Sequence, residues 1–183
     1  MYTNVKCINV VDASTLGNVR NQLSNYNTII VSIHAGKSYN VQAIQNLIQG
    51  KNAIMVFFTS PYRVSSFKSA IDKSSGIVMG YENTEFAQEY AAQAIFGGYG
   101  FEGKFPVTIG GGLFKEGEGI ITGKTRLSYN LPEEVGINSS KLDVIADIVD
   151  EGIKEQAFPG CQVLVAKDGV IIYNRSFGTF EYG

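Results

Sequence analysis

The sequence has 183 residues, of which 44% are hydrophobic and 17% are charged, and its 15 basic and 17 acidic residues give a net charge of −2. This composition is typical of a folded globular chain and excludes an intrinsically disordered one. Without a basic cluster the chain is not expected to bind nucleic acid, and no apolar run reaches the roughly 20 residues of a membrane-spanning helix, so we expect no membrane span.

Four short apolar runs in the first part of the chain predict β-strands. These runs are Lys6–Val11, Thr28–Ile33, Ala53–Phe58 and Gly76–Gly80. They are continuous rather than alternating, which is typical of parallel strands covered on both faces. Two stretches, Asn40–Gln49 and Asn83–Phe96, repeat apolar residues at helical spacing, and Asn83 or Thr84 can cap the second helix. This alternation predicts an α/β fold, a three-layer sandwich with a mainly parallel sheet.

The composition changes after Ile109. Gly110–Gly123 is rich in glycine, lacks periodicity and predicts a loop or linker. A stretch with one apolar helical face follows, and it ends before Pro159. The residues Lys167-Asp168-Gly169 then join two apolar runs, which is a strong hairpin signal. We therefore predict a C-terminal extension made of a helix and a β-hairpin over Cys161–Tyr173.

Polar and aromatic residues follow three of the predicted strands. In open α/β sheets, ligands bind outside the carboxyl ends of the strands. We therefore expect this edge of the sheet to frame a substrate site, and we assign no catalytic residue, no metal ligand and no cofactor to the chain. The candidate residues for this edge are His34, Ser60, Tyr62, Tyr81 and Glu82.

Several matches to known motifs lack the structural context that their chemistry requires. Gly98–Gly103 matches the dinucleotide fingerprint G-x-G-x-x-G but follows a predicted helix, whereas that fingerprint must follow a strand and open a helix. Gly36-Lys37-Ser38 lacks the first glycine of a P-loop, whose place is taken by Val31. Ser65–Lys68 and Tyr81–Asn83 imitate serine β-lactamase motifs but lie too close together. We read the first of these two as the solvated face of a short helix.

The two cysteines, Cys7 and Cys161, are far apart in the sequence, and each lies in an apolar, strand-like run. They do not form the pattern of a disulfide framework, and with a single histidine they offer no metal-ligand spacing. We therefore expect two buried thiols that pack as small hydrophobic groups.

Several segments in order carry a resemblance to a known family. They read "NTIIVSIHAGKS", "AIMVFFTSPYRVSSF", "SGIVMGYEN" and then "YENT…AQEYAAQAIFGG…GKFPVTIGG", which ends at Gly111. Residues 1–115 thereby resemble the C-terminal α/β domain of family 3 glycoside hydrolases, in the β-N-acetylglucosaminidase branch. In that family an upstream barrel domain binds the sugar and carries the catalytic residues, so none is transferred to this chain. The family also implies a strand before Lys6–Val11, which this sequence does not include.

A second resemblance covers residues 133–183. The segment "FPGCQVLVAKDGVIIYNRSFG" resembles the opening of the serine β-lactamase and penicillin-binding-protein-like family. There the nucleophilic serine and its lysine follow this hairpin, and the present sequence stops at Gly183 before such a pair. The two resemblances imply an α/β domain at 1–115, a linker at 116–132 and the truncated start of a serine-hydrolase-like domain at 133–183.

The resemblances imply a non-catalytic accessory fragment of a β-N-acetylglucosaminidase-like glycoside hydrolase. Its bacterial parent is expected to be exported or periplasmic and to act on cell-wall or other N-acetylglucosamine-containing glycans. The expected partners are the upstream barrel domain of the parent and, through the C-terminal hairpin, a second copy in a homodimer, unless the hairpin docks on the α/β domain. The alternative is a stand-alone α/β module that binds a protein or a glycan and has no enzymatic role.

Overall fold

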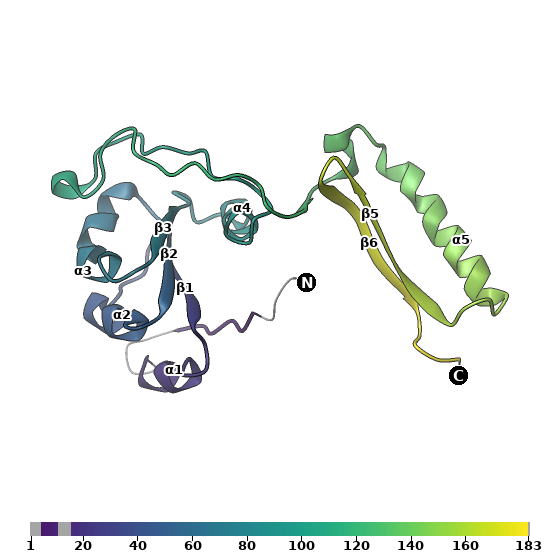
Figure 1. Cartoon of the computed structure of the whole chain (residues 1–183), viewed down its shortest axis with the longest axis horizontal. Coiled ribbons are helices and arrows are strands. Elements are labelled where there is room, and N and C mark those ends of the chain that lie inside the picture. The colour runs from purple at the N-terminus through teal and green to yellow at the C-terminus, as the bar shows by residue number, and fades with distance from the viewer. Residues whose placement is uncertain (1–4, 11–15, 183) are drawn as a thin grey trace. The chain divides into compact units, whose positions relative to one another are not determined.

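The computed structural model describes residues 5–10 and 16–182, which form two compact units (Figure 1). The first unit consists of residues up to 92 together with residues 102–120. The second unit consists of residues 93–101 together with the chain from residue 121 onward. The domain boundaries expected at 115 and 132 stay predictions, because this division follows compactness alone.

The first unit is built around a three-stranded parallel sheet. Its strands are β1 (Thr28–His34), β2 (Asn52–Phe58) and β3 (Gly76–Met79), in the order β1-β2-β3. β1 and β2 pair along their whole lengths, so His34 lies opposite Phe58 where both strands end. Parallel neighbours need crossover connections, which helices supply here. The predicted α/β fold is therefore confirmed.

The helices of this unit connect successive strands. α2 (Val41–Ile48) joins β1 to β2, and a 3₁₀ turn η2 (Pro61–Phe67) with α3 (Lys68–Ile71) joins β2 to β3. Both connections lie on one side of the sheet, and α4 (Glu85–Ile95) lies on the other (Figure 1). α2 begins where it was predicted because the Asn40 side chain accepts a backbone N–H of its first turn at 3.0 Å.

The core of the first unit lies between the sheet and the helices α2 and α3. Alternate residues of each strand point to this side, as the two-residue period of a strand requires. The Phe57 and Phe67 rings meet edge to face there, with centroids 5.5 Å apart. The buried core residues are Ile29, Ile33, Ile44, Ile48, Ala53, Met55, Phe57, Val64, Phe67, Ala70, Ile71 and Ile109.

The strand predicted at Lys6–Val11 is wrong over the residues that the structure describes. Residues 6–10 form neither strand nor helix, and the last residue of the run lies outside the described residues. An apolar run forms a strand only where a neighbour pairs with its backbone groups, and among the described strands β1 pairs with β2 alone. The predicted burial of Cys7 is wrong because this segment is exposed, and Cys161 is only partly buried. A short helix, α1 (Leu16–Gln22), was not predicted.

The second unit contains the predicted helix and hairpin. β4 (Ser128–Tyr129), β5 (Gly160–Lys167) and β6 (Val170–Gly178) form a sheet in the order β4-β6-β5, in which β5 and β6 are antiparallel. α5 (Asp143–Lys154) packs against β6. β4 lies inside the segment 116–132 that was expected to be a linker.

The hairpin turn has the geometry that its sequence predicts. Asp168 and Gly169 both have positive φ, of 52° and 75°. A type I′ turn requires positive φ at both central residues, and Asp-Gly is one of the pairs that tolerate it. The local sequence therefore specifies the turn that pairs β5 with β6.

The glycine-rich segment Gly110–Gly123 folds back along the residues that precede it. The Phe105 N–H donates to the carbonyl oxygen of Glu118 at 2.8 Å, and Ile109 forms an antiparallel bridge with Phe114. The Phe105 and Phe114 rings stack with centroids 5.0 Å apart. This loop is therefore held by backbone pairs and a ring contact.

Candidate functional site

The carboxyl ends of β1, β2 and β3 lie at one edge of the sheet, because the strands are parallel and paired up to their last residues. We call this the carboxyl edge; it comprises His34, Phe58 and residues 80–83. At this edge the structure brings His34 next to the segment that contains Tyr81 and Glu82. Two distant parts of the sequence thus supply three of the five predicted candidates.

His34 is fixed by contacts to its ring and its backbone. Its Nδ1 lies 2.7 Å from Oδ1 of Asn83, and its ring stacks on Phe58 with centroids 5.3 Å apart and planes 28° from parallel. Its backbone N–H donates to the Tyr39 hydroxyl at 2.7 Å. Because an amide oxygen only accepts, the neutral imidazole carries its proton on Nδ1. Nε2 is then an acceptor, and within the described residues it has no hydrogen-bond partner.

Asn83 is the site residue that the sequence analysis missed. Asn83 and Thr84 were alternatives for the cap of α4, and the Thr84 hydroxyl takes that role by accepting the Ala87 N–H at 3.2 Å. The Asn83 amide oxygen therefore stays available for His34, and it also accepts from Gln88 Nε2 at 3.1 Å. The sequence did contain a signal for this role. Asn83 and Thr84 can both cap a helix, and because α4 needs only one cap, the other side chain is free to contact a different residue.

Tyr81 lies in a tight turn directly after β3. Its φ is 61°, a left-handed conformation that costs an ordinary L-residue roughly 1–2 kcal/mol. The turn closes with the Glu82 N–H donating to the Gly80 carbonyl oxygen at 2.6 Å. Partial burial raises the pKa of the Tyr81 hydroxyl above its ordinary value of 10.0, so this hydroxyl stays a donor at neutral pH. Such backbone outliers cluster at functional sites.

The other two predicted candidates make no contact with this cluster that would place them in it. Ser60 is exposed and precedes η2, and Tyr62 lies on η2 with 67% of its surface exposed. Neither side chain forms a hydrogen bond within the described residues. We therefore centre the candidate site on the His34–Asn83 contact and include Tyr81 and the exposed Glu82, which precede Asn83 in the same turn.

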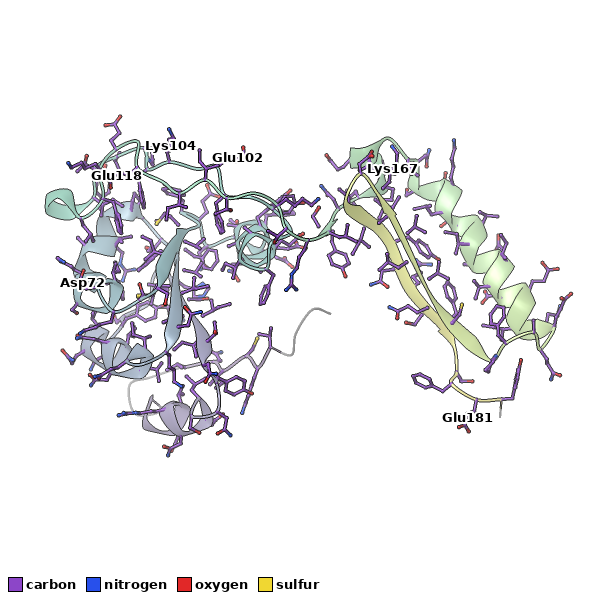
Figure 2. The ribbon with its side chains drawn as sticks, in the orientation of Figure 1. Asp72, Glu102, Lys104, Glu118, Lys167 and Glu181 are labelled. Carbon is purple, nitrogen blue, oxygen red and sulfur yellow. The ribbon has the colours of Figure 1, made fainter. Side chains whose placement is uncertain are left out.

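Ser65 and Lys68 do not form a catalytic pair. The Ser65 hydroxyl donates to the Tyr62 carbonyl oxygen at 3.1 Å, and Lys68 forms an ion pair with Asp72 at 2.8 Å. Figure 2 labels Asp72 on this helical segment. The expected solvated helical face is confirmed for Lys68, which is exposed on α3, whereas Ser65 is half-buried on η2.

A different serine and lysine meet in the second unit. Lys124 Nζ donates to Ser128 Oγ at 3.0 Å and to the Gly169 carbonyl oxygen at 2.6 Å. A nucleophilic serine must be accessible to its substrate, whereas Ser128 is only 1% exposed. The contact therefore fastens β4 to the hairpin turn, and no acyl-transfer site follows from it.

The glycines of Gly98–Gly103 shape a loop, as expected. α4 ends before Gly97, whose φ is 83°, and the loop follows this helix rather than a strand. A Cβ at Gly100 would lie 2.3 Å from the Thr122 carbonyl oxygen. The motif thus permits a close backbone approach and does not open a helix toward a nucleotide.

Comparison with protein-family models, curated proteins and solved structures finds no match for this chain. The resemblances to family 3 glycoside hydrolases and to serine β-lactamases therefore stay predictions. No group of three or more histidine, cysteine, aspartate or glutamate side chains that could hold a metal ion occurs among residues 5–10 and 16–182. Over the same residues, no helix has the length and apolar character needed to cross a bilayer.

Proposed function

We propose that the first unit is a non-catalytic accessory domain whose carboxyl edge contacts an N-acetylglucosamine-containing glycan. The observation that supports this most directly is the His34–Asn83 contact, which holds Nδ1 and leaves Nε2 without a hydrogen-bond partner among the described residues. Tyr81, which carries a hydroxyl donor, and Glu82, which carries a carboxylate, precede Asn83 in the turn that follows β3. A sugar offers hydroxyl and amide groups that such side chains bind through a few placed hydrogen bonds.

The proposal places no bond cleavage at this edge. Glycoside hydrolysis uses a pair of carboxyl groups that flank the scissile bond. The cluster offers one carboxylate, that of the exposed Glu82, and one imidazole, whose Nδ1 is held by an amide. In this proposal catalysis belongs to the barrel domain of a larger parent enzyme, which acts on cell-wall or related glycans.

A ¹⁵N NMR titration of the whole chain with a β-1,4-linked N-acetylglucosamine tetramer tests ligand contact. We expect amide shifts at His34 and over residues 80–83, with a dissociation constant in the micromolar to millimolar range. Asn83→Ala releases the imidazole and is expected to weaken binding about three- to tenfold, the effect of one hydrogen bond. Absence of shifts up to about 10 mM glycan would remove the proposal.

Two tyrosines with nearly equal exposure provide a matched control. Tyr81 is 37% exposed at the carboxyl edge, and Tyr26 is 36% exposed before β1, at the other end of that strand. Tyr81→Ala is expected to weaken glycan binding, whereas Tyr26→Ala is expected to leave it unchanged. Equal effects of the two variants would contradict a site at this edge.

Activity of a longer parent protein separates the accessory role from the alternative. In an accessory domain, Asn83→Ala in the intact parent should change KM for an N-acetylglucosaminide. Glycan binding by the chain without such activity in the parent would favour the stand-alone binding module. That second candidate rests on the same cluster, because His34 and Asn83 need no enzyme to bind a sugar.

A further inference from the structure

The sheet of the second unit has two edges of very different length. β4 forms one edge with two residues, and β5 forms the other with eight. Among the described strands, β5 pairs with β6 alone. A very short edge strand protects a sheet from further pairing, whereas a long unpaired edge is a template for another strand.

The free backbone groups of β5 can be assigned from the hairpin ladder. The Thr179 N–H donates to the Pro159 carbonyl oxygen at 3.0 Å, which marks these two residues as a hydrogen-bonded pair. Bonded and non-bonded pairs alternate along an antiparallel ladder, so every second residue after Pro159 bonds to β6. The residues between them direct their N–H and C=O groups away from β6. These residues are Gly160, Gln162 and Leu164.

This edge lacks the features that usually block pairing. β5 contains no proline, and its one charged residue is Lys167 at the tip of the hairpin (Figure 2). The register shift between Val165 and Ala166 lies near that tip and leaves the preceding residues regular. Leu164 is 49% exposed. An uncharged, regular and partly apolar edge favours strand addition.

The small core of this unit favours a partner as well. Its buried apolar side chains among the described residues are Pro132, Val149, Ile171 and Ile172. The main contact of α5 with this sheet is to β6, the middle strand. A few strands with little buried apolar surface are marginally stable in water, so an added strand would stabilise the unit.

We propose that β5 pairs with β5 of a second copy of this chain, antiparallel and about a twofold axis. The two three-stranded sheets then become one continuous sheet with the two-residue strand β4 at each outer edge. Antiparallel pairing of identical strands places uncharged residues opposite each other and puts the two Lys167 side chains at opposite ends. Parallel pairing would bring those two charges together.

Sedimentation velocity of the whole chain from about 10 μM to 1 mM tests the proposal, and the expected result is a concentration-dependent dimer. Leu164→Pro removes an N–H that points away from β6, so the hairpin keeps its own hydrogen bonds. Because the change occurs in both copies, we expect it to weaken the dimer about tenfold or more. Leu164→Lys, which adds a like charge to each edge, is expected to have the same effect.

Two controls carry the same added charge elsewhere. Ser176→Lys lies on the middle strand β6, on the same exposed face as Leu164, and is expected to leave the dimer intact. Ser32→Lys lies on β1, an edge strand of the first unit, and is also expected to have no effect. Retained cross-strand NOEs between β5 and β6 verify that each Leu164 variant keeps its hairpin.

Three results would overturn the proposal. The first is a monomer throughout the concentration range, which would show that β5 does not pair with β5 of a second copy. The second is a dimer unaffected by Leu164→Lys. The third is a dimer lost in Ser32→Lys but kept in both Leu164 variants, which would assign the contact to β1.

Discussion

Gly80 connects the packing of the first unit to its carboxyl edge, and replacing it tests that connection. A Cβ at this position would lie 2.7 Å from both Cδ1 and Cε1 of the Phe58 ring. That ring is 4% exposed and stacks on His34, so it cannot move aside without disturbing its neighbours. We expect Gly80→Ala to displace the ring and, with it, the imidazole.

The size of the effect follows from two opposing terms. Adding a methyl group to a packed site costs roughly 1–3 kcal/mol. The φ of Gly80 is not left-handed, so alanine fits its backbone conformation. Replacing such a glycine reduces the conformational entropy of the unfolded chain and stabilises the folded state by about 0.4–1 kcal/mol. We therefore expect Gly80→Ala to lower the free energy of unfolding of the first unit by about 1–2 kcal/mol.

Gly76 provides a matched control on the same strand. A Cβ at Gly76 would meet no atom within 4 Å, and its φ is also not left-handed. Gly76→Ala is therefore expected to leave the stability unchanged or raise it by up to about 1 kcal/mol. The comparison between the two alanines removes the effect on the unfolded chain that they share.

Urea unfolding followed by NMR peak intensities is the suitable assay, because the two units can unfold separately and only first-unit amides should be read. The expected result is a lower midpoint for Gly80→Ala alone, with shifted ring resonances of Phe58 and His34. Equal midpoints for the two variants would refute the reasoning. That result would mean that the Phe58 ring can accommodate the added methyl group without loss of stability.

Two further predictions concern helix and turn caps. Thr84→Ala removes the hydroxyl that accepts the Ala87 N–H and should cost about 1 kcal/mol, read as faster hydrogen exchange in the first turn of α4; unchanged exchange would contradict the cap. The Ser139 N–H, 2.8 Å from Oε1, holds the pKa of Glu133 below its ordinary value of 4.5. A lowered folded pKa means that this contribution to stability is present above pH 4.5 and is lost as pH falls through the lowered value. Glu133→Gln should lack this acid-dependent loss, and a Glu133 titration midpoint at or above 4.5 would contradict the contact.

The parallel sheet was predictable because its strands are continuous apolar runs separated by helical patterns. Two errors near the N-terminal part of the chain have physical causes. Residues 6–10 are apolar enough for a strand, but none of the described strands pairs with them, and a strand cannot be inferred without its neighbour. α1 was missed because it is short and mostly polar, and among its residues 18–22, whose burial the structure describes, Val19 is the one that is buried.

The site was predictable in its position but not in its contacts. The rule that ligands bind at the carboxyl ends of parallel strands selected His34 and Tyr81 without any knowledge of their neighbours. The partner of His34 lies 49 residues away at Asn83, and no local pattern encodes a contact over that separation. Ser60 and Tyr62 satisfied the same rule and still lie outside the cluster, because the rule specifies an end of the sheet and not the direction of a side chain.

Tyr81 is where the local rules of sequence and the observed backbone disagree most clearly. A residue in the left-handed conformation is expected to be glycine or asparagine. Both types lie close to Tyr81 in the sequence, with Gly80 directly before it and Asn83 two residues after it. Gly80 is required where it is by the Phe58 ring, and Asn83 is held by His34. The left-handed conformation therefore falls on a tyrosine, at a cost of roughly 1–2 kcal/mol that the surrounding contacts must offset. The strained residue thus lies two positions before the residue that holds the imidazole, which is the kind of place where the proposed ligand contact would need a fixed backbone.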